Sequence, residues 1–145
     1  MSEVILKELI KTEEDTISFA NKMKDYFNEG ETVILNGDLG TGKTFFVKQF
    51  AKNFNIDNVN SPTFAIVNVY EGDGLKINHF DFYRIKYVQE LFDIGFNDYL
   101  SDKDALTFIE WGEMFPEILP SSRYEIDIKF TENLDREIEV KKYAI

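Results

Sequence analysis

The chain has 145 residues, of which 43% are hydrophobic and 15% aromatic, and this predicts a single domain over residues 1–145 with a packed core. It contains no cysteine, which excludes disulfide scaffolds, thiolate metal sites and cysteine nucleophiles. The net charge of −11 argues against direct binding to nucleic acid or to anionic membranes, and the sequence has neither a long apolar run nor a signal-peptide pattern, so we expect a cytoplasmic protein without a membrane partner.

The first part of the chain predicts a strand, a helix and a second strand. Residues 3–9 form a short strand pattern, and Thr12 and Asp15 have the spacing of a helix capping box. Gly30 is expected to end this helix as its C-terminal cap, and residues 32–37 predict a buried strand. The apolar face of the helix is expected to consist of Ile17, Ala20, Met23 and Phe27.

The middle of the chain alternates between helical and strand patterns. Residues 43–54 have helical periodicity, whereas residues 64–70 and 75–84 are strand-like and surround a Glu-Gly-Asp-Gly turn, which predicts a β-hairpin. Residues 87–100 are again helical in pattern, with a break at Gly95.

The last third predicts more strands. Residues 105–110 are apolar until the final residue, as expected of a central parallel strand. Residues 123–130 and 136–143 alternate cleanly and predict a second hairpin, half solvated and placed at the sheet edge. These elements indicate an α/β fold with a mixed sheet flanked by helices. Residues 85–145 carry 14 acidic and 7 basic residues, which is consistent with a solvated acidic face or with a docking face.

A phosphate-binding motif lies between the predicted strand and helix. Residues 37–44, GDLGTGKT, match G-x-x-x-x-G-K-[ST]. Glycines allow the backbone N–H groups to surround a phosphate, Lys43 would reach the β- and γ-phosphates, and the Thr44 hydroxyl would bind Mg²⁺. No Asn-Lys-x-Asp pattern follows the later strands, which favours ATP over GTP. The loop residues expected to bind nucleotide are Asp38, Leu39, Gly40, Thr41, Gly42, Lys43 and Thr44.

Two acidic residues at strand ends are candidates for Mg²⁺ binding and catalysis, because ligands bind at the carboxyl ends of parallel strands. Asp81 stands between two phenylalanines, and Glu110 ends residues 105–110. The alternatives are a structural ion pair of Asp81 with Arg84 and an exposed strand end at Glu110. His79 is interpreted as a packed, hydrogen-bonded group, or as a contact to the phosphates or to Asp81.

Two further residues have two interpretations each, and a third has one. Arg84 is an internal arginine finger or an ion-pair partner. Trp111 is a platform near the nucleotide or an ordinary core residue. Thr63 lies with Ser61 in the loop where P-loop proteins sense the γ-phosphate.

Taken together, these motifs resemble the bacterial TsaE family, also called YjeE or YdiB. The matching segments, in order, are GDLGTGKT at 37–44, Ser61-Pro62-Thr63-Phe64 with Tyr70, His79-Phe80-Asp81-Phe82-Tyr83-Arg84, and Glu110-Trp111. The phosphate loop alone is unspecific, whereas the other three segments are specific to the family, and the resemblance covers nearly the whole chain.

The resemblance implies a P-loop ATPase, with ATP or ADP and Mg²⁺ as cofactors, required for the threonylcarbamoyladenosine modification of tRNA. Such a protein would act with the TsaB–TsaD complex, reset that complex between turnovers, and contact tRNA only through it. The implied Mg²⁺ and catalytic set is Thr44, Asp81 and Glu110, with Lys43 on the phosphates, Trp111 near the nucleotide and residues 61–64 as a switch-like loop.

Two alternatives to this function remain open. One is a nucleotide-gated binding module whose hydrolysis is incidental. The other is a small-molecule kinase, which is disfavoured because such kinases use an arginine-rich lid. This chain has only three arginines and no insertion long enough for a lid.

Overall fold

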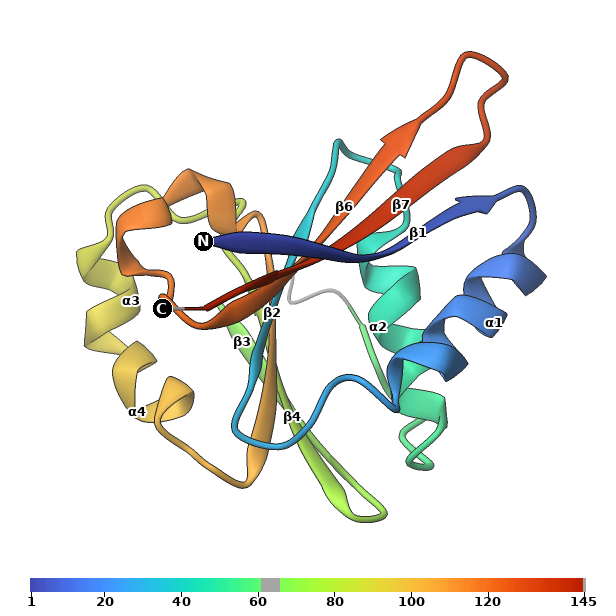
Figure 1. Ribbon diagram of the computed structural model, residues 1–145. Helices are drawn as coiled ribbons and strands as arrows, with labels where there is room; N and C mark the ends of the chain where they lie inside the picture. The colour runs from blue at the N-terminus through green and yellow to red at the C-terminus, as the bar shows by residue number, and fades with distance from the viewer. Residues whose placement is uncertain (61–65, 145) are drawn as a thin grey trace.

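The structure is a computed structural model that describes residues 1–60 and 66–144. Its described part is built around a mixed seven-stranded sheet with helices on both faces (Figure 1). The strands are β1 (Ser2–Ile10), β2 (Thr32–Asn36), β3 (Val67–Gly72), β4 (Leu75–Asp81), β5 (Ala105–Glu110), β6 (Arg123–Phe130) and β7 (Arg136–Tyr143). The helices are α1 (Glu13–Met23), α2 (Lys43–Lys52), α3 (Gln89–Asp93), α4 (Phe96–Leu100) and two 3₁₀ turns (Gly112–Met114 and Pro116–Ile118).

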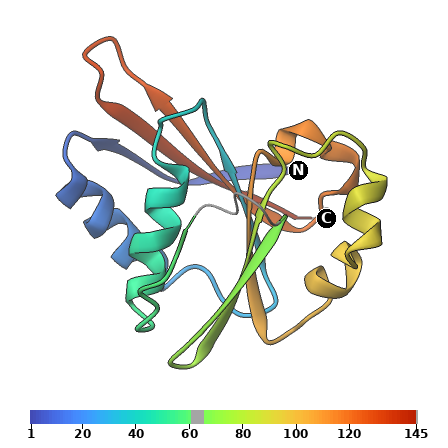
Figure 2. The ribbon, with the colours of Figure 1, turned by 180° about the vertical axis from the view of Figure 1, so that it is seen from behind.

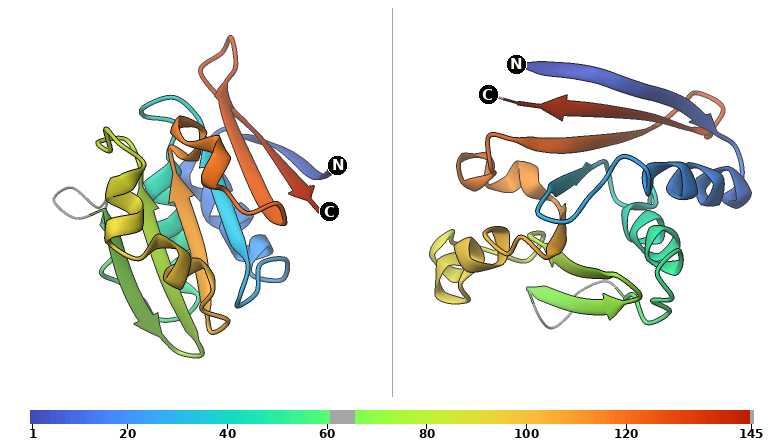
Figure 3. Two further views of the ribbon diagram at one scale, coloured as in Figure 1. Left: turned by 90° about the vertical axis from the view of Figure 1, so that its left-hand side faces the viewer. Right: turned by 60° about the horizontal axis from the view of Figure 1, so that its bottom comes forward.

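The strand order is β1-β7-β6-β2-β5-β4-β3. The central pairs β6–β2, β2–β5 and β5–β4 are parallel, and the outer pairs are antiparallel. The expected hairpins are therefore present, but the placement of the second one at the sheet edge is wrong. β1 pairs with β7 from Ser2 opposite Tyr143 to Ile10 opposite Arg136 and forms the edge itself. Figure 3 shows the two chain ends side by side on this edge.

Two apolar cores lie on opposite faces of the sheet. α1 and α2 cover one face, while α3, α4 and the 3₁₀ turns cover the other (Figures 1 and 2). β5 is buried along its whole length, as a central strand should be. Phe108 packs with the α2 rings of Phe46 and Phe50, and Ile109, on the opposite face, packs in the cluster that contains Phe96 of α4.

The predicted start of α1 is confirmed, but its predicted end is wrong. The Thr12–Asp15 capping box is present, with Asp15 N donating to Thr12 Oγ1 at 3.1 Å. The helix stops at Met23, so Gly30 is not its cap; Gly30 lies in the following loop at φ +83°, where its N–H donates to the Ala105 carbonyl.

The buried face of α1 also differs from the expected one. Ile17 is 36% exposed, whereas Phe19 is 1% exposed. Thr16, Ala20 and Met23 are buried with Phe19, and these positions follow the helical repeat when it is counted from Thr16.

The other boundaries shift by a few residues. α2 ends at Lys52 rather than at residue 54, and β4 ends at Asp81 rather than continuing to residue 84. The helical segment after β4 is divided at Gly95, as expected, because this glycine has φ +83°. No helix in the described ranges has the length and apolarity needed to cross a membrane.

Candidate functional site

The loop between β2 and α2 carries the phosphate-binding motif. Gly42 precedes α2 with φ +101°, a conformation that a residue with a Cβ rarely adopts. Gly37 is required for a different reason: a Cβ there would lie 2.7 Å from Thr41 Oγ1 and 2.8 Å from the Ile128 carbonyl oxygen. The motif glycines therefore allow the loop to turn sharply while packing directly against β6.

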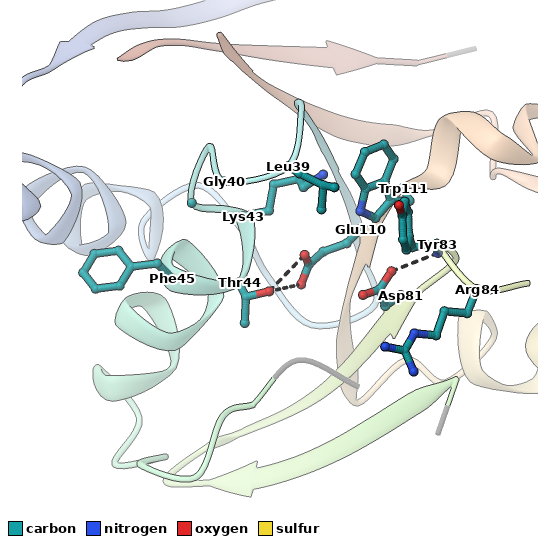
Figure 4. Close-up of a pocket in the computed structure, with 11 residues that line it drawn as sticks. Leu39, Gly40, Lys43, Thr44, Phe45, Asp81, Tyr83, Arg84, Glu110 and Trp111 are labelled. Atoms are coloured by element: carbon teal, nitrogen blue, oxygen red, sulfur yellow. Dashed lines mark hydrogen bonds between the residues drawn. The ribbon is translucent and has the colours of Figure 1, made fainter. Parts of the chain in front are cut away.

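A cleft of about 380 Å³ opens beside this loop (Figure 4). Its walls come from the loop, from the first turn of α2, and from the ends of β4 and β5. The size lies in the range typical of small-ligand pockets. Most of the predicted site residues therefore meet in one place, and those that line the cleft are Leu39, Gly40, Gly42, Lys43, Thr44, Asp81, Glu110 and Trp111.

Glu110 lies at the centre of a buried hydrogen-bond network. Its carboxylate accepts hydrogen bonds from Thr44 Oγ1, with oxygen separations of 2.8 and 3.0 Å, and from His79 Nε2 at 2.6 Å. Glu110 is only 3% exposed, so the interpretation as an exposed strand end is wrong. These hydrogen bonds stabilise the Glu110 carboxylate, because a buried charge is tolerated only when it is paired and hydrogen-bonded.

His79 is a packed, hydrogen-bonded residue, which confirms the first of its interpretations. It is 0% exposed, and its Nδ1 lies 3.3 Å from the Tyr70 hydroxyl oxygen. On the cleft side, its hydrogen-bond partner is Glu110. His79 therefore supports the Glu110 carboxylate from behind and does not reach the cleft surface.

Asp81 lies beside Glu110 because the two residues are opposite each other in the parallel β4–β5 ladder. The Asp81 carboxylate accepts a hydrogen bond from the Tyr83 backbone N–H at 2.9 Å. Burial is the main cause that raises the pKa of Asp81, and the nearby negative charge of Glu110 adds to the increase. Two carboxylates close together in a partly buried site provide an environment that favours a cation.

Lys43 is folded back onto its own loop. Its Nζ donates to the Gly37 carbonyl at 2.6 Å and lies 3.5 Å from the centre of the Trp111 ring. Lys43 is 5% exposed, and burial lowers its pKa, while the negative charges of Glu110 and its neighbours act in the opposite direction. The ammonium group is thus held inside the cleft, between the Gly37 carbonyl and the Trp111 ring.

Trp111 forms part of the cleft wall. It is half-buried, it adopts φ +61°, and its ring contacts the Tyr83 ring at a centroid distance of 5.0 Å. A left-handed backbone is costly for a large side chain, at about 1–2 kcal/mol. The turn at Trp111 points the ring over Lys43 and gives the cleft a flat aromatic side.

The oxygen atoms around Thr44 suit Mg²⁺ better than they suit a metal ion that is coordinated by protein side chains alone. The described residues contain no group of three or more His, Asp or Glu side chains that could hold a metal ion. One hydroxyl and two carboxylates instead resemble the usual Mg²⁺ arrangement, in which one or two carboxylates act together with phosphate oxygens and water. Thr44, Asp81 and Glu110 are the residues that would hold the ion.

Some residues that line the cleft were not among the predicted site residues, and one predicted segment lies outside the described residues. Tyr83 and Phe45 line the cleft but were not singled out. For Tyr83 the signal was its position two residues after Asp81, where the chain leaves β4. Arg84 also lines the cleft. Thr63 and the other residues of the switch-like segment lie outside the described residues.

Comparisons with known proteins agree with the motif pattern. The model of the family described as "Threonylcarbamoyl adenosine biosynthesis protein TsaE" matches residues 10–138. The chain is 36% identical over 135 residues to the tRNA threonylcarbamoyladenosine biosynthesis protein TsaE of Rickettsia typhi, covering 92% of each chain. It is also 36% identical to TsaE of Bacillus subtilis over 126 residues, covering 86% of this chain and 78% of the relative.

The fold has a counterpart among solved structures. The crystal structure of YdiB from Bacillus subtilis superposes with a TM-score of 0.81 and 28% identity, covering 99% of this chain and 88% of that one. The similarity confirms the P-loop α/β fold that the sequence predicted. With the phosphate loop, the strand-end carboxylates and these relatives considered together, the chain belongs to the TsaE family, whose role is in the biosynthesis of threonylcarbamoyladenosine in tRNA.

Proposed function

We propose that this protein is a Mg²⁺-dependent ATPase that acts with a TsaB–TsaD complex and resets it between rounds of tRNA modification. The observation that carries the proposal is the convergence of Lys43, Thr44, Asp81 and Glu110 on one cleft beside the phosphate loop. These are the groups that phosphoryl transfer to water requires: a cation for the phosphates, oxygen ligands for a metal, and an acid to orient water.

Nucleotide binding requires Lys43 to change partners. In the structure its ammonium group is hydrogen-bonded to the Gly37 carbonyl and covered by Trp111. A β- or γ-phosphate would replace the carbonyl oxygen as the acceptor, because a charged phosphate forms the stronger hydrogen bond. The loop N–H groups and the positive end of α2 would complete the anion site.

Thr44 and Asp81 would hold Mg²⁺, which neutralises the charge that develops on the phosphates. Glu110 would orient the attacking water or support the metal, and both roles use the same carboxylate position. Thr44 is already hydrogen-bonded to Glu110, so occupation of the metal site would redirect the Thr44 hydroxyl away from that carboxylate.

Partner proteins would supply the contact with tRNA. A chain with a net charge of −11 would be repelled by the phosphate backbone at most of its surface. The acidic residues of 85–145 are better suited to a protein surface that carries basic groups.

The proposal is tested by multiple-turnover tRNA modification with purified TsaB and TsaD. Wild type should sustain turnover, and Glu110→Ala should stall after about one round. Lys43→Ala should bind no nucleotide and give no stimulation. If Glu110→Ala sustains turnover as well as wild type, the chain is an ATP-gated binding module. If wild type has no effect, the proposed place in the reaction is wrong.

A further inference from the structure

A second cation approaches the phosphate loop from the side opposite the metal-binding carboxylates. β6 runs parallel to β2, so its carboxyl end lies next to the point where β2 enters the loop. β7 returns from that end and begins with Arg136. The β6–β7 hairpin, far from the loop in sequence, therefore forms one flank of it.

The Arg136 guanidinium lies close to Gly42 of the loop. A Cβ built on Gly42 would be 3.7 Å from Arg136 Nη1 and 3.9 Å from Cζ. Gly42 is the residue before Lys43, and its left-handed conformation leads into α2. The guanidinium therefore lies beside the residue that leads from the loop into α2.

This guanidinium has no counter-ion within the described residues. No ion pair or hydrogen bond of its side chain is found in residues 1–60 and 66–144, and its Nε is buried without a hydrogen-bond partner. Its one aromatic neighbour, Phe130, has its ring centre 5.8 Å from Cζ. A half-buried cation with unused donors is costly unless an anion joins it.

The position of Arg136 indicates which anion that is. Thr44, Asp81 and Glu110 mark the metal and γ-phosphate end of the site, on the side of β4 and β5. A nucleotide is a linear chain of phosphates, so its nucleoside end must leave the loop on the other side, where β6 and β7 lie. Two cations lie on that side: Lys129 lines a pocket with Gly37 and Asp38 at the start of the loop, and Arg136 lies beside Gly42, next to Lys43.

We propose that Arg136 binds the α-phosphate of the nucleotide through its Nη groups and so contributes affinity for ATP and ADP alike. This assignment rests on the proposed nucleotide binding. It requires a small rotation of a side chain that has no hydrogen bond to break.

The test compares Arg136→Gln with Arg123→Gln, a matched control at the amino end of β6 that removes the same charge. Arg123 is ion-paired with Glu125 at 2.6 Å and lies away from the loop. Calorimetry with Mg·ADP should show about 10- to 100-fold weaker binding for Arg136→Gln, an intermediate loss for Arg136→Lys, and a change of less than about threefold for the control.

Phosphorus NMR of ADP at saturation separates contact from indirect effects. Replacing Arg136 should move the α-phosphate resonance and leave the β-phosphate resonance in place. Unchanged affinity in Arg136→Gln, or a shift of the β resonance alone, overturns the assignment while nucleotide binding itself stands. If wild type binds no ADP, the proposed function fails instead. Should Arg136→Gln fail to fold, the Arg136→Lys spectrum decides the question.

Discussion

Substitutions of Glu110 should affect the stability of the fold and the rate of ATP hydrolysis to different extents. Glu110→Ala leaves the fully buried His79 Nε2 without its acceptor, and the Thr44 hydroxyl loses the same partner. An unsatisfied buried donor costs about 1–3 kcal/mol, and the relief of burying a charged carboxylate offsets part of this cost. We therefore expect a loss of about 1–2 kcal/mol, which lowers the Tm by about 3–6 °C for a chain of this size.

Glu110→Gln is the matched comparison. Its amide oxygen can still accept from His79, so its Tm should stay within about 2 °C of wild type. Both variants lose the carboxylate, however, and both should hydrolyse ATP about 10²- to 10⁴-fold more slowly, the usual contribution of a positioned acid–base group. Binding of ADP should change by less than about threefold in either variant.

Three measurements check this prediction: thermal unfolding, ADP calorimetry and phosphate release at saturating ATP. Wild-type hydrolysis by Glu110→Gln would refute a role for the negative charge. Equal losses of ADP affinity and of hydrolysis would refute the separation of binding from catalysis. An unchanged Tm for Glu110→Ala would mean that His79 finds another acceptor, and the hydrogen-bond reasoning above would then be wrong.

Three more outcomes follow from the same geometry. The emission of Trp111, the only tryptophan, should change at saturating ADP because the Lys43 ammonium leaves its ring; constant emission would mean that the contact in the structure persists. The pKa of Asp81 is raised by burial, so protons compete with Mg²⁺ at a higher pH than for an ordinary aspartate. Mg·ADP affinity should therefore start to fall at that higher pH as the solution is acidified, and Asp81→Asn should flatten the profile in a calorimetric pH series. A Cβ at Gly72 would lie 2.3 Å from a backbone carbonyl oxygen, so Gly72→Ala should lose about 2–3 kcal/mol in urea unfolding. Gly74→Ala, with φ +77° but open space around it, should lose only about 1 kcal/mol.

The parts of the fold that could be predicted are those with local signals. The apolar runs of β2 and β5, the capping box of α1 and the two hairpins all depend on residues close together in sequence. Gly30 shows the limit of such signals. Glycine is favoured both as a helix cap and in a left-handed loop, and here the loop after α1 uses it.

The strand order could not be predicted in the same way. β1 alternates like any half-exposed strand, and nothing in its own residues indicates that its partner is β7. The predicted hairpin of β6 and β7 therefore looked like an edge, although β1 covers it. Long-range pairing depends on which apolar faces remain to be covered after the local elements have formed.

The same difference between local and long-range signals explains why only part of the candidate site was predicted. Asp81 and Glu110 were found because a charged residue at the end of an apolar strand is a local signal, and the parallel register then places them side by side. Arg136 gave no comparable signal. Its approach to Gly42 arises from the packing of two segments that are distant in sequence, and only the assembled sheet reveals it.

The pairing of β1 with β7 has a consequence for how the protein is made. β1 is synthesised well before its partner β7, since Ser2 lies opposite Tyr143 and Ile10 opposite Arg136. Chain elongation proceeds at about 5–20 residues per second, so residues 2–10 remain without their strand partner for at least several seconds. During that time they expose a nine-residue strand to other chains. Completion of the sheet, and of the hairpin flank beside the phosphate loop, is thus a late event that follows emergence of β7 from the ribosome.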